Sequence, residues 1–303
     1  MAKASARPVL PPGALAQELD RLLASVAGSV DIVIEETHPA PESLHELHRE
    51  MRRLRHALAL WMELLPSRQR ALIRPLDRRL KRLARLVGRV RDRDVVLGLL
   101  EGGSLPRPVR EDVPRVARLR ARWRDDARTG RELLRVYLRS ERDAHLFEGL
   151  RELLELPTRP AAGSLLGTIL VEEQERRHDR VRAAHRKARR KPTADRFHRL
   201  RIQVRRLRHL NEVRSRLDGL TLARFPPSAR RLQEQLGRLH DLDVVLADLD
   251  RELESSAWAR ALRDARRAVR DAIRAELKDG RWPKLELVDA GPRSNPRARH
   301  AGS

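Results

Sequence analysis

The sequence has no cysteine and few aromatic residues. The lack of cysteine excludes disulfides, thiolate metal sites and cysteine nucleophiles. Aromatic residues make up 3% of the chain, which leaves little material for the stacking platforms of proteins that bind single-stranded nucleic acid. No apolar run approaches the ~18 residues of a membrane-spanning helix, and the opening residues lack the apolar stretch of a signal peptide. We therefore expect a cytoplasmic protein that makes no contact with a membrane.

Positive charge, in contrast, is abundant. Lysine and arginine number 66 against 43 acidic residues, so the formal net charge is +23. Nearly all of the basic residues are arginines, whose planar guanidinium suits bidentate binding of phosphate oxygens. A genome-wide arginine bias would explain the choice of arginine over lysine, but not the excess of positive over negative charge. A surface that repels itself this strongly predicts an anionic partner.

Helical periodicity dominates the chain, and the turn signals of β-hairpins are absent. The sequence predicts an all-α domain over residues 12–280, built from roughly eight helices. The predicted helices cover residues 15–36, 42–65, 68–100, 114–156 with a break, 164–190, 193–217, 228–254 and 258–277. Residues 281–303 carry proline, glycine, serine and arginine without periodicity, and we predict a disordered basic tail there.

Two motifs occur twice. The run RRLRH at 52–56 recurs at 205–209, and GRVRDRDVVL at 88–97 returns as GRLHDLDVVL at 237–246. Repetition in register over two separate motifs indicates an internal duplication. We assign the first repeat to residues of about 12–156 and the second to about 162–280, and we expect the two sets of motifs to face a shared centre.

The basic side chains of these motifs form rows. On a helical wheel of about 100° per residue they fall on one face, beside an apolar arc. Like charges three or four residues apart destabilise a helix by a few tenths of a kcal/mol per pair, and a bound polyanion would remove that cost. The residues predicted to bind the polyanion are His45, His48, Arg52, Arg53, Arg55, Arg78, Lys81, Arg85, Arg89, His198, Arg201, Arg205, Arg206, Arg208, Arg230 and Arg238.

Two other patterns could indicate metal or catalytic chemistry. Asp94 and Asp243 project toward the apolar arcs of their helices, where a carboxylate needs a partner, so we favour structural ion pairs over catalytic or magnesium-binding roles. His45 and His48 have the one-turn spacing of metal ligands, but no third ligand accompanies them and the second repeat has Arg201 instead, so we expect no metal. No glycine-rich phosphate loop, nucleophile elbow or His-Glu-x-x-His motif occurs. We therefore expect a binding protein without a cofactor, not an enzyme.

The segment HxxRIxxRRLR at 198–208, followed by LGxxHDxDV at 236–244, resembles the CHAD family, the conserved histidine α-helical domain. The resemblance extends over both halves, about residues 15–279. It implies two four-helix bundles related by a pseudo-twofold axis around a central basic groove or pore. It also implies binding of inorganic polyphosphate and association with polyphosphate granules.

The chain departs from the family pattern at His48, where the family has arginine, and at Glu234, which interrupts the basic row of the second repeat. The strand motif of the triphosphate-tunnel domain that often accompanies CHAD domains is absent, so a stand-alone domain is expected. The alternative interpretation is a helical nucleic-acid-binding protein, because the charge alone fits that class equally well. The sequence does not indicate an oligomeric state.

Overall fold

The computed structural model describes residues 10, 13–36, 39–156, 162–217, 220–222, 227–249, 251–278 and 287–289. Over these residues the structure is all-α apart from two three-residue strands, which confirms the predicted fold class. In chain order its α-helices are α1 (Ala14–Glu35), α2 (Pro41–Leu64), α3 (Ser67–Glu101), α4 (Val113–Asp143), α5 (Leu146–Glu152), α6 (Ala162–Arg190), α7 (Ala194–Leu217), α8 (Pro227–Ala247), α9 (Arg251–Glu254) and α10 (Ala257–Lys278). Short 3₁₀ turns precede α4, at Arg110–Asp112, and follow α5, at Leu153–Glu155.

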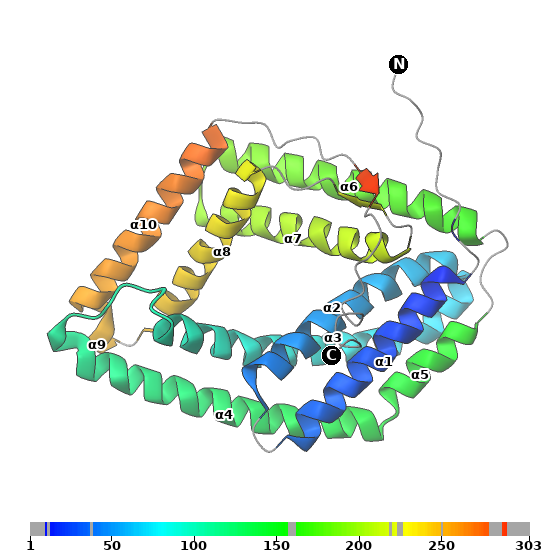
Figure 1. Ribbon diagram of the computed structural model, residues 1–303, viewed down its shortest axis with the longest axis horizontal. Coiled ribbons are helices and arrows are strands. Elements are labelled where there is room, and N and C mark those ends of the chain that lie inside the picture. Colours follow the sequence, from blue (N-terminus) through cyan, green and yellow to red (C-terminus); the bar gives the residue numbers. More distant parts are fainter. Residues whose placement is uncertain are drawn as a thin grey trace, which may run out of the picture.

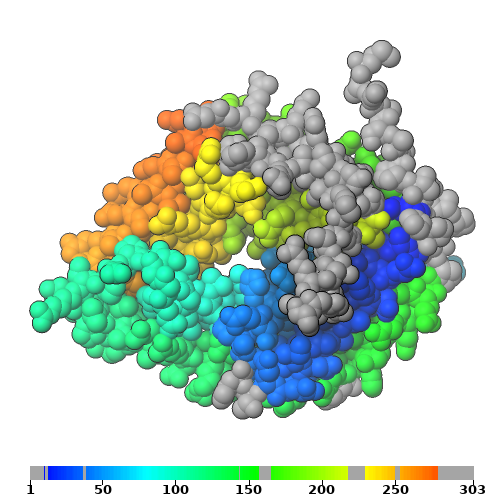
Figure 2. Space-filling model, viewed as in Figure 1, coloured from blue at the N-terminus to red at the C-terminus, as the bar shows by residue number. Residues whose placement is uncertain are grey.

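The helices form a four-sided frame (Figure 1). Helices α2, α3, α7 and α8 line its inside, and α4, α6 and α10 run along the outside. Helix α2 packs against α7, and α3 against α8, so the inner helices of the two halves meet. The four inner helices are the ones that carry the repeated motifs. Figure 2 shows an opening at the centre of the molecule, between the blue-to-cyan surface of the first half and the yellow-green surface of the second.

The buried apolar residues divide into two cores. One contains Trp61 and Leu83, and the other contains Trp123 and Trp258. Helices α3, α4, α6 and α7 contribute to both cores; Phe197 of α7, for example, belongs to the second core, and residues near its end belong to the first. The cores are therefore not two closed bundles that each use one repeat alone. The pseudo-twofold relation between the repeats stays a prediction.

One of the predicted helices is broken in the structure. The helix predicted over 228–254 is interrupted, since α8 ends at Ala247 and α9 begins at Arg251. After this break, α10 begins at Ala257 with a cap from a distant segment. The buried carboxylate of Asp112 accepts a hydrogen bond of 2.8 Å from the backbone N–H of Trp258. A free N–H at a helix start needs such an acceptor, so this contact fixes where α10 begins.

The strands were not predicted from the sequence. Strand β1 (Leu220–Leu222) pairs in antiparallel fashion with β2 (Leu287–Asp289). Strand β2 lies within residues 281–303, where a disordered tail was expected, so these three residues depart from that expectation. The rest of that segment lies outside the described residues.

Candidate functional site

The arginines of the two RRLRH motifs come together where α2 meets α7. Burial, followed by the charges of Arg205 and Arg208 on α7, lowers the pKa of Arg52 on α2 to about 10. The pKa of Arg205 is also lowered, by burial and by neighbouring arginines, although Asp92 opposes the shift. An arginine pKa falls this far only where several cations share a poorly solvated place. The duplicated motifs thus face one centre, as predicted.

His48 lies among these arginines as a tightly packed ring. Burial, together with Arg52, Arg91 and Arg205, lowers its pKa to about 3, so it is neutral near pH 7. Its ring packs on α3 at Gly88, where a β-carbon would lie 3.2 Å from the ring carbon Cε1. Glycine at this position of the repeated motif therefore lets α2 and α3 approach closely.

A chain of hydrogen bonds joins α2 to α7. The guanidinium of Arg52 donates to Nε2 of His209. Because that nitrogen accepts, the ring proton belongs on Nδ1, which lies 3.2 Å from the Glu212 carboxylate. Burial raises the pKa of Glu212, but the bond from His209 and the charges of Arg208 and Arg53 outweigh it and bring the value to about 2. Glu212 is thus a permanent anion that holds the Arg52 side chain in place through His209.

The α8 side of the centre has its own histidine pair. The rings of His198 on α7 and His240 on α8 have their centroids 6.1 Å apart. Burial, followed by Arg201 and His198, lowers the pKa of His240 to about 4. Burial raises the pKa of Asp241, although Arg201 counteracts it. Helix α8 therefore adds a neutral histidine and one carboxylate to a mainly positive surface, to which α3 contributes a second carboxylate, Asp92, 3.2 Å from Arg91.

Arg91 of α3 is a central residue that the site prediction missed. It contributes to the lowered pKa values of His45, His48 and Arg52 on α2. It also contributes to the lowered pKa of Arg205 on α7. The repeat itself contained the signal, because Arg91 occupies the position of His240 in the second copy of the glycine motif. We define the central cationic cluster as the side chains of His45, His48, Arg52, Arg91, His198, Arg201, Arg205, Arg208 and His240.

The basic residues predicted to bind the polyanion on α3 are Arg78, Lys81, Arg85 and Arg89, and this row lies partly beside the cluster. Burial and Arg85 lower the pKa of Arg55, while Asp77 counteracts the shift, so Arg55 links α2 to the row on α3. Lys81 forms an ion pair of 2.6 Å with Asp77. Arg78, Arg85 and Arg89 are exposed. The row is therefore accessible to solvent but partly neutralised.

The other predicted contacts are less closely associated with the centre. Arg53 pairs with Glu50 and lies 3.8 Å from Glu212, so its charge is already balanced. Arg206, Arg230 and Arg238 are exposed. The polyanion-binding role of these four residues therefore stays a prediction.

Asp94 and Asp243 differ more than their matching sequence positions suggest. The Asp94 side chain is 5% exposed and pairs with Arg131 of α4. Asp243 is 39% exposed and lies 3.5 Å from Arg266 of α10. The expectation that Asp243 is buried is therefore wrong, because α10 covers it less than α4 covers Asp94.

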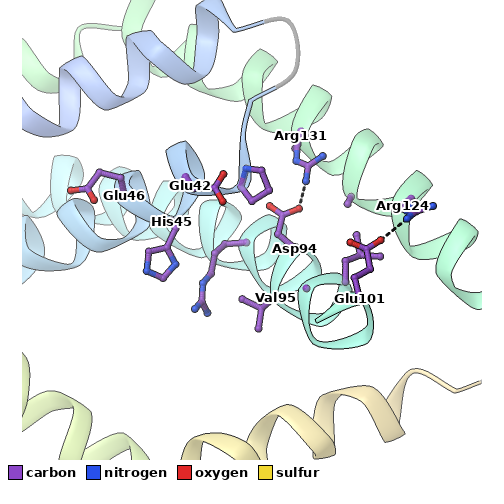
Figure 3. Close-up of a pocket in the computed structure, with 13 residues that line it drawn as sticks. Glu42, His45, Glu46, Asp94, Val95, Glu101, Arg124 and Arg131 are labelled. Carbon is purple, nitrogen blue, oxygen red and sulfur yellow. Dashed lines mark hydrogen bonds and ion pairs between the residues drawn. The ribbon is translucent and has the colours of Figure 1, made fainter. Parts of the chain in front are cut away.

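A cavity of about 670 Å³ adjoins the cluster between α2, α3 and α4 (Figure 3). His45 and Arg91 belong both to its lining and to the cluster. Its other charged residues are four acids and two arginines, and two ion pairs, Asp94–Arg131 and Glu101–Arg124, join α3 to α4 beside it. This cavity is close to neutral, unlike the surface next to it.

The described residues contain no group of three or more histidine, aspartate or glutamate side chains arranged to hold a metal ion. Within the same part of the chain, no helix combines the length and apolar character needed to cross a membrane.

Comparison with known proteins agrees with the fold and the motifs. The family model described as CHAD domain matches residues 13–250. Among solved structures, the chain is similar to the CHAD domain from the plant Ricinus communis, with a TM-score of 0.62 and 24% identity over 94% of this chain and 98% of that one. It is also similar to PptA from Streptomyces chartreusis, with a TM-score of 0.56 and 17% identity over 89% of this chain and 95% of that one. No curated protein sequence matches the chain significantly.

Proposed function

Because the chain belongs to the CHAD-domain family, we propose that it binds inorganic polyphosphate at the central cationic cluster and associates with polyphosphate granules. The observation that carries this proposal is the crowding of arginines where α2 meets α7. Arg52 of α2 contacts His209 of α7, and burial, Arg205 and Arg208 together lower the pKa of Arg52 to about 10. Crowded, half-buried guanidiniums raise the free energy of the free protein. A chain of phosphates that runs between α2 and α7 would relieve the repulsion and satisfy their N–H groups.

The cluster also contains an unsatisfied donor. The Nε atom of Arg91 is buried without a hydrogen-bond partner, and so is that of Arg55, which lies outside the cluster on α2. An unmade hydrogen bond from a buried charged group costs several kcal/mol in principle, and phosphate oxygens would supply the missing acceptors. This favours a multidentate anion over a monovalent counter-ion.

Nucleic acid is the rival ligand, and the aromatic content separates the two. Proteins that bind single strands without sequence preference usually stack bases on aromatic side chains. Phe197, the one aromatic residue within a basic motif, is buried in the second core. A flexible phosphate chain has no bases to stack, so the cluster suits it better.

The experiment that tests the proposal compares long-chain polyphosphate with single-stranded DNA at one salt concentration. We expect polyphosphate to bind more tightly at equal phosphate concentration, and its affinity to rise with chain length until the cluster is spanned. By analogy with single-stranded nucleic acid, an anion held by about five arginines loses roughly 100-fold in affinity between about 50 and 200 mM salt. Equal binding of short and long chains, or tighter binding of DNA, would contradict the proposal.

Acid is expected to tighten polyphosphate binding while it destabilises the free protein. The pKa of His48 falls from its usual value of 6.5 to about 3 in the folded state, so between these values the unfolded chain binds a proton that the folded chain does not. Stability conferred by neutral His48 is therefore present above about pH 6.5 and is lost as the pH falls toward 3. A bound polyanion favours the charged ring, so by linkage its affinity rises over the same window.

Melting temperature and affinity at about pH 7.5 and pH 5, with and without polyphosphate, measure the two effects. The His45→Gln, His48→Gln double variant is the control, since it should lose the part of the pH dependence of binding that these two rings contribute, while His240, whose pKa is lowered to about 4, keeps its own contribution. If wild type and variant respond to acid alike, these two histidines do not contact the phosphate chain.

A further inference from the structure

A cationic cavity lies between α6 and α7, outside the central cationic cluster. Its volume is about 410 Å³, within the ~300–1,000 Å³ range of small-molecule sites. Its charged and polar lining residues are Arg180, Lys187, Arg196, Arg199 and Gln203. Among the residues that the structure describes, no acidic side chain lines it, in contrast to the mixed cavity beside α4.

This cavity and the central cluster use different faces of α7. Arg196, Arg199 and Gln203 are spaced by three and four residues and share one face of the helix. On a wheel of about 100° per residue, Arg201 and Arg205 fall roughly on the opposite side. One small ligand therefore cannot contact both sets, and changes at one site leave the other in place.

The lining is arranged as a receptor for a compact anion. The guanidinium of Arg196 donates to the backbone carbonyl of Lys187 at 2.7 Å, which fixes its position across the two helices. Arg199 has Asp195 as its partner at 2.9 Å, but these side chains are 69% and 64% exposed, so that ion pair contributes little and an incoming anion can replace it.

The remaining positions leave room for the ligand. Arg180 and Lys187 are exposed, and they lie two turns apart on the same face of α6. Between them Ala183 and Ala184 line the cavity with short side chains. Cations thus surround a small apolar floor, and the Gln203 amide can donate a further hydrogen bond.

We propose that the α6–α7 cavity binds a triphosphate group, either as inorganic tripolyphosphate or as part of a nucleoside triphosphate. Four cations in this small space repel one another, and a ligand with several negative charges removes that repulsion. Arginine side chains bind phosphate oxygens in bidentate geometry, which favours phosphate over a carboxylate of equal charge density. The site is distinct from the central surface and does not depend on long polyphosphate.

Isothermal titration calorimetry with tripolyphosphate and with ATP tests the proposal on the full chain. The Arg180→Glu, Lys187→Glu double variant should bind tripolyphosphate at least about tenfold more weakly than wild type, since two charged contacts to phosphate are lost. The matched control is Arg186→Glu, Arg189→Glu, which makes the same change of net charge at exposed positions of α6 outside the cavity. If both variants weaken binding equally, overall charge explains the result and the site does not exist.

The two ligands identify the source of the triphosphate group. Similar affinities for tripolyphosphate and ATP would mean that the cavity recognises the phosphates alone, whereas tighter binding of ATP would mean that it accepts a nucleotide. If neither ligand binds saturably, the proposal is wrong.

A third variant separates this inference from the proposed function. Arg52→Glu, Arg205→Glu should lose long-chain polyphosphate but keep tripolyphosphate bound at the cavity. If it loses both, short chains bind at the centre, so the cavity proposal fails while the central site stands. If the cavity variant alone loses long chains, the proposal of a central site fails instead.

Discussion

Replacing Arg52 and Arg205 together by glutamate is expected to reduce polyphosphate affinity by at least ~100-fold. Each charge-assisted hydrogen bond contributes about 1.5–3 kcal/mol, and about 1.4 kcal/mol corresponds to a tenfold change. The new carboxylates also repel the ligand. Fluorescence anisotropy or calorimetry with long-chain polyphosphate measures the loss, and far-UV circular dichroism checks that helicity is retained.

Two further variants make this result interpretable. Arg107→Glu, Arg120→Glu makes the same change of net charge at exposed positions remote from the cluster, and we expect only a small loss of affinity. Arg52→Gln, Arg205→Gln removes the charges without reversing them, and the amide introduced at position 52 keeps a donor for His209. An affinity that follows net charge alone, equal for both charge-reversal pairs, would mean that polyphosphate binds diffusely and not at the cluster.

The repeated motifs explain how much of the fold and site could be predicted from the sequence. Helical periodicity and proline positions predicted the starts and ends of α1, α2, α3 and α7 to within about two residues, since these are local properties of the chain. The duplication further predicted that α2 and α7 face one another. The strand pair β1–β2 was missed because its partners are far apart in the sequence and only three residues long.

The site prediction missed several residues for one physical reason. Arg91, His209 and Glu212 act through contacts between helices, and these contacts depend on how closely α2 approaches α3 and α7. Glu212 follows the RRLRH motif of the second repeat by three residues, and on a wheel it looks like an ordinary surface acid. Its contact with His209 lies within α7, but only the packing of α2 on α7 connects that contact to Arg52.

Asp94 and Asp243 show the same limit of prediction from sequence, and the stability of their variants can measure it. Their sequence contexts are nearly identical, and both were expected to form buried ion pairs. In the structure Asp94 is almost fully covered, whereas Asp243 and its partner Arg266 are each more than a third exposed. The helix that covers each carboxylate decides its environment, and the repeated motif around each aspartate does not contain that information.

Asp94→Ala is accordingly expected to destabilise the protein by about 3 kcal/mol, at the low end of the ~3–5 kcal/mol for breaking a buried pair, because the Arg131 side chain keeps 23% of its exposure. The loss leaves the Arg131 guanidinium without its carboxylate, and its Nε already lacks a partner. For a chain of 303 residues, that corresponds to a melting temperature roughly 5 °C lower.

Asp243→Ala is the matched control, because it deletes the equivalent carboxylate of the other repeat. An exposed pair contributes ~0–1 kcal/mol, so its melting temperature should fall by no more than about 2 °C. Differential scanning calorimetry on both variants at one pH measures the contrast, and polyphosphate affinity measured alongside separates stability from binding. Equal destabilisation by the two substitutions would mean that α10 covers Asp243 in solution as closely as α4 covers Asp94. Asp94→Ala could instead keep its melting temperature and lose polyphosphate binding. That result would mean that Asp94 organises the binding surface through Arg91 and His45, its neighbours in the adjoining cavity. Its ion pair with Arg131 would then not stabilise the fold.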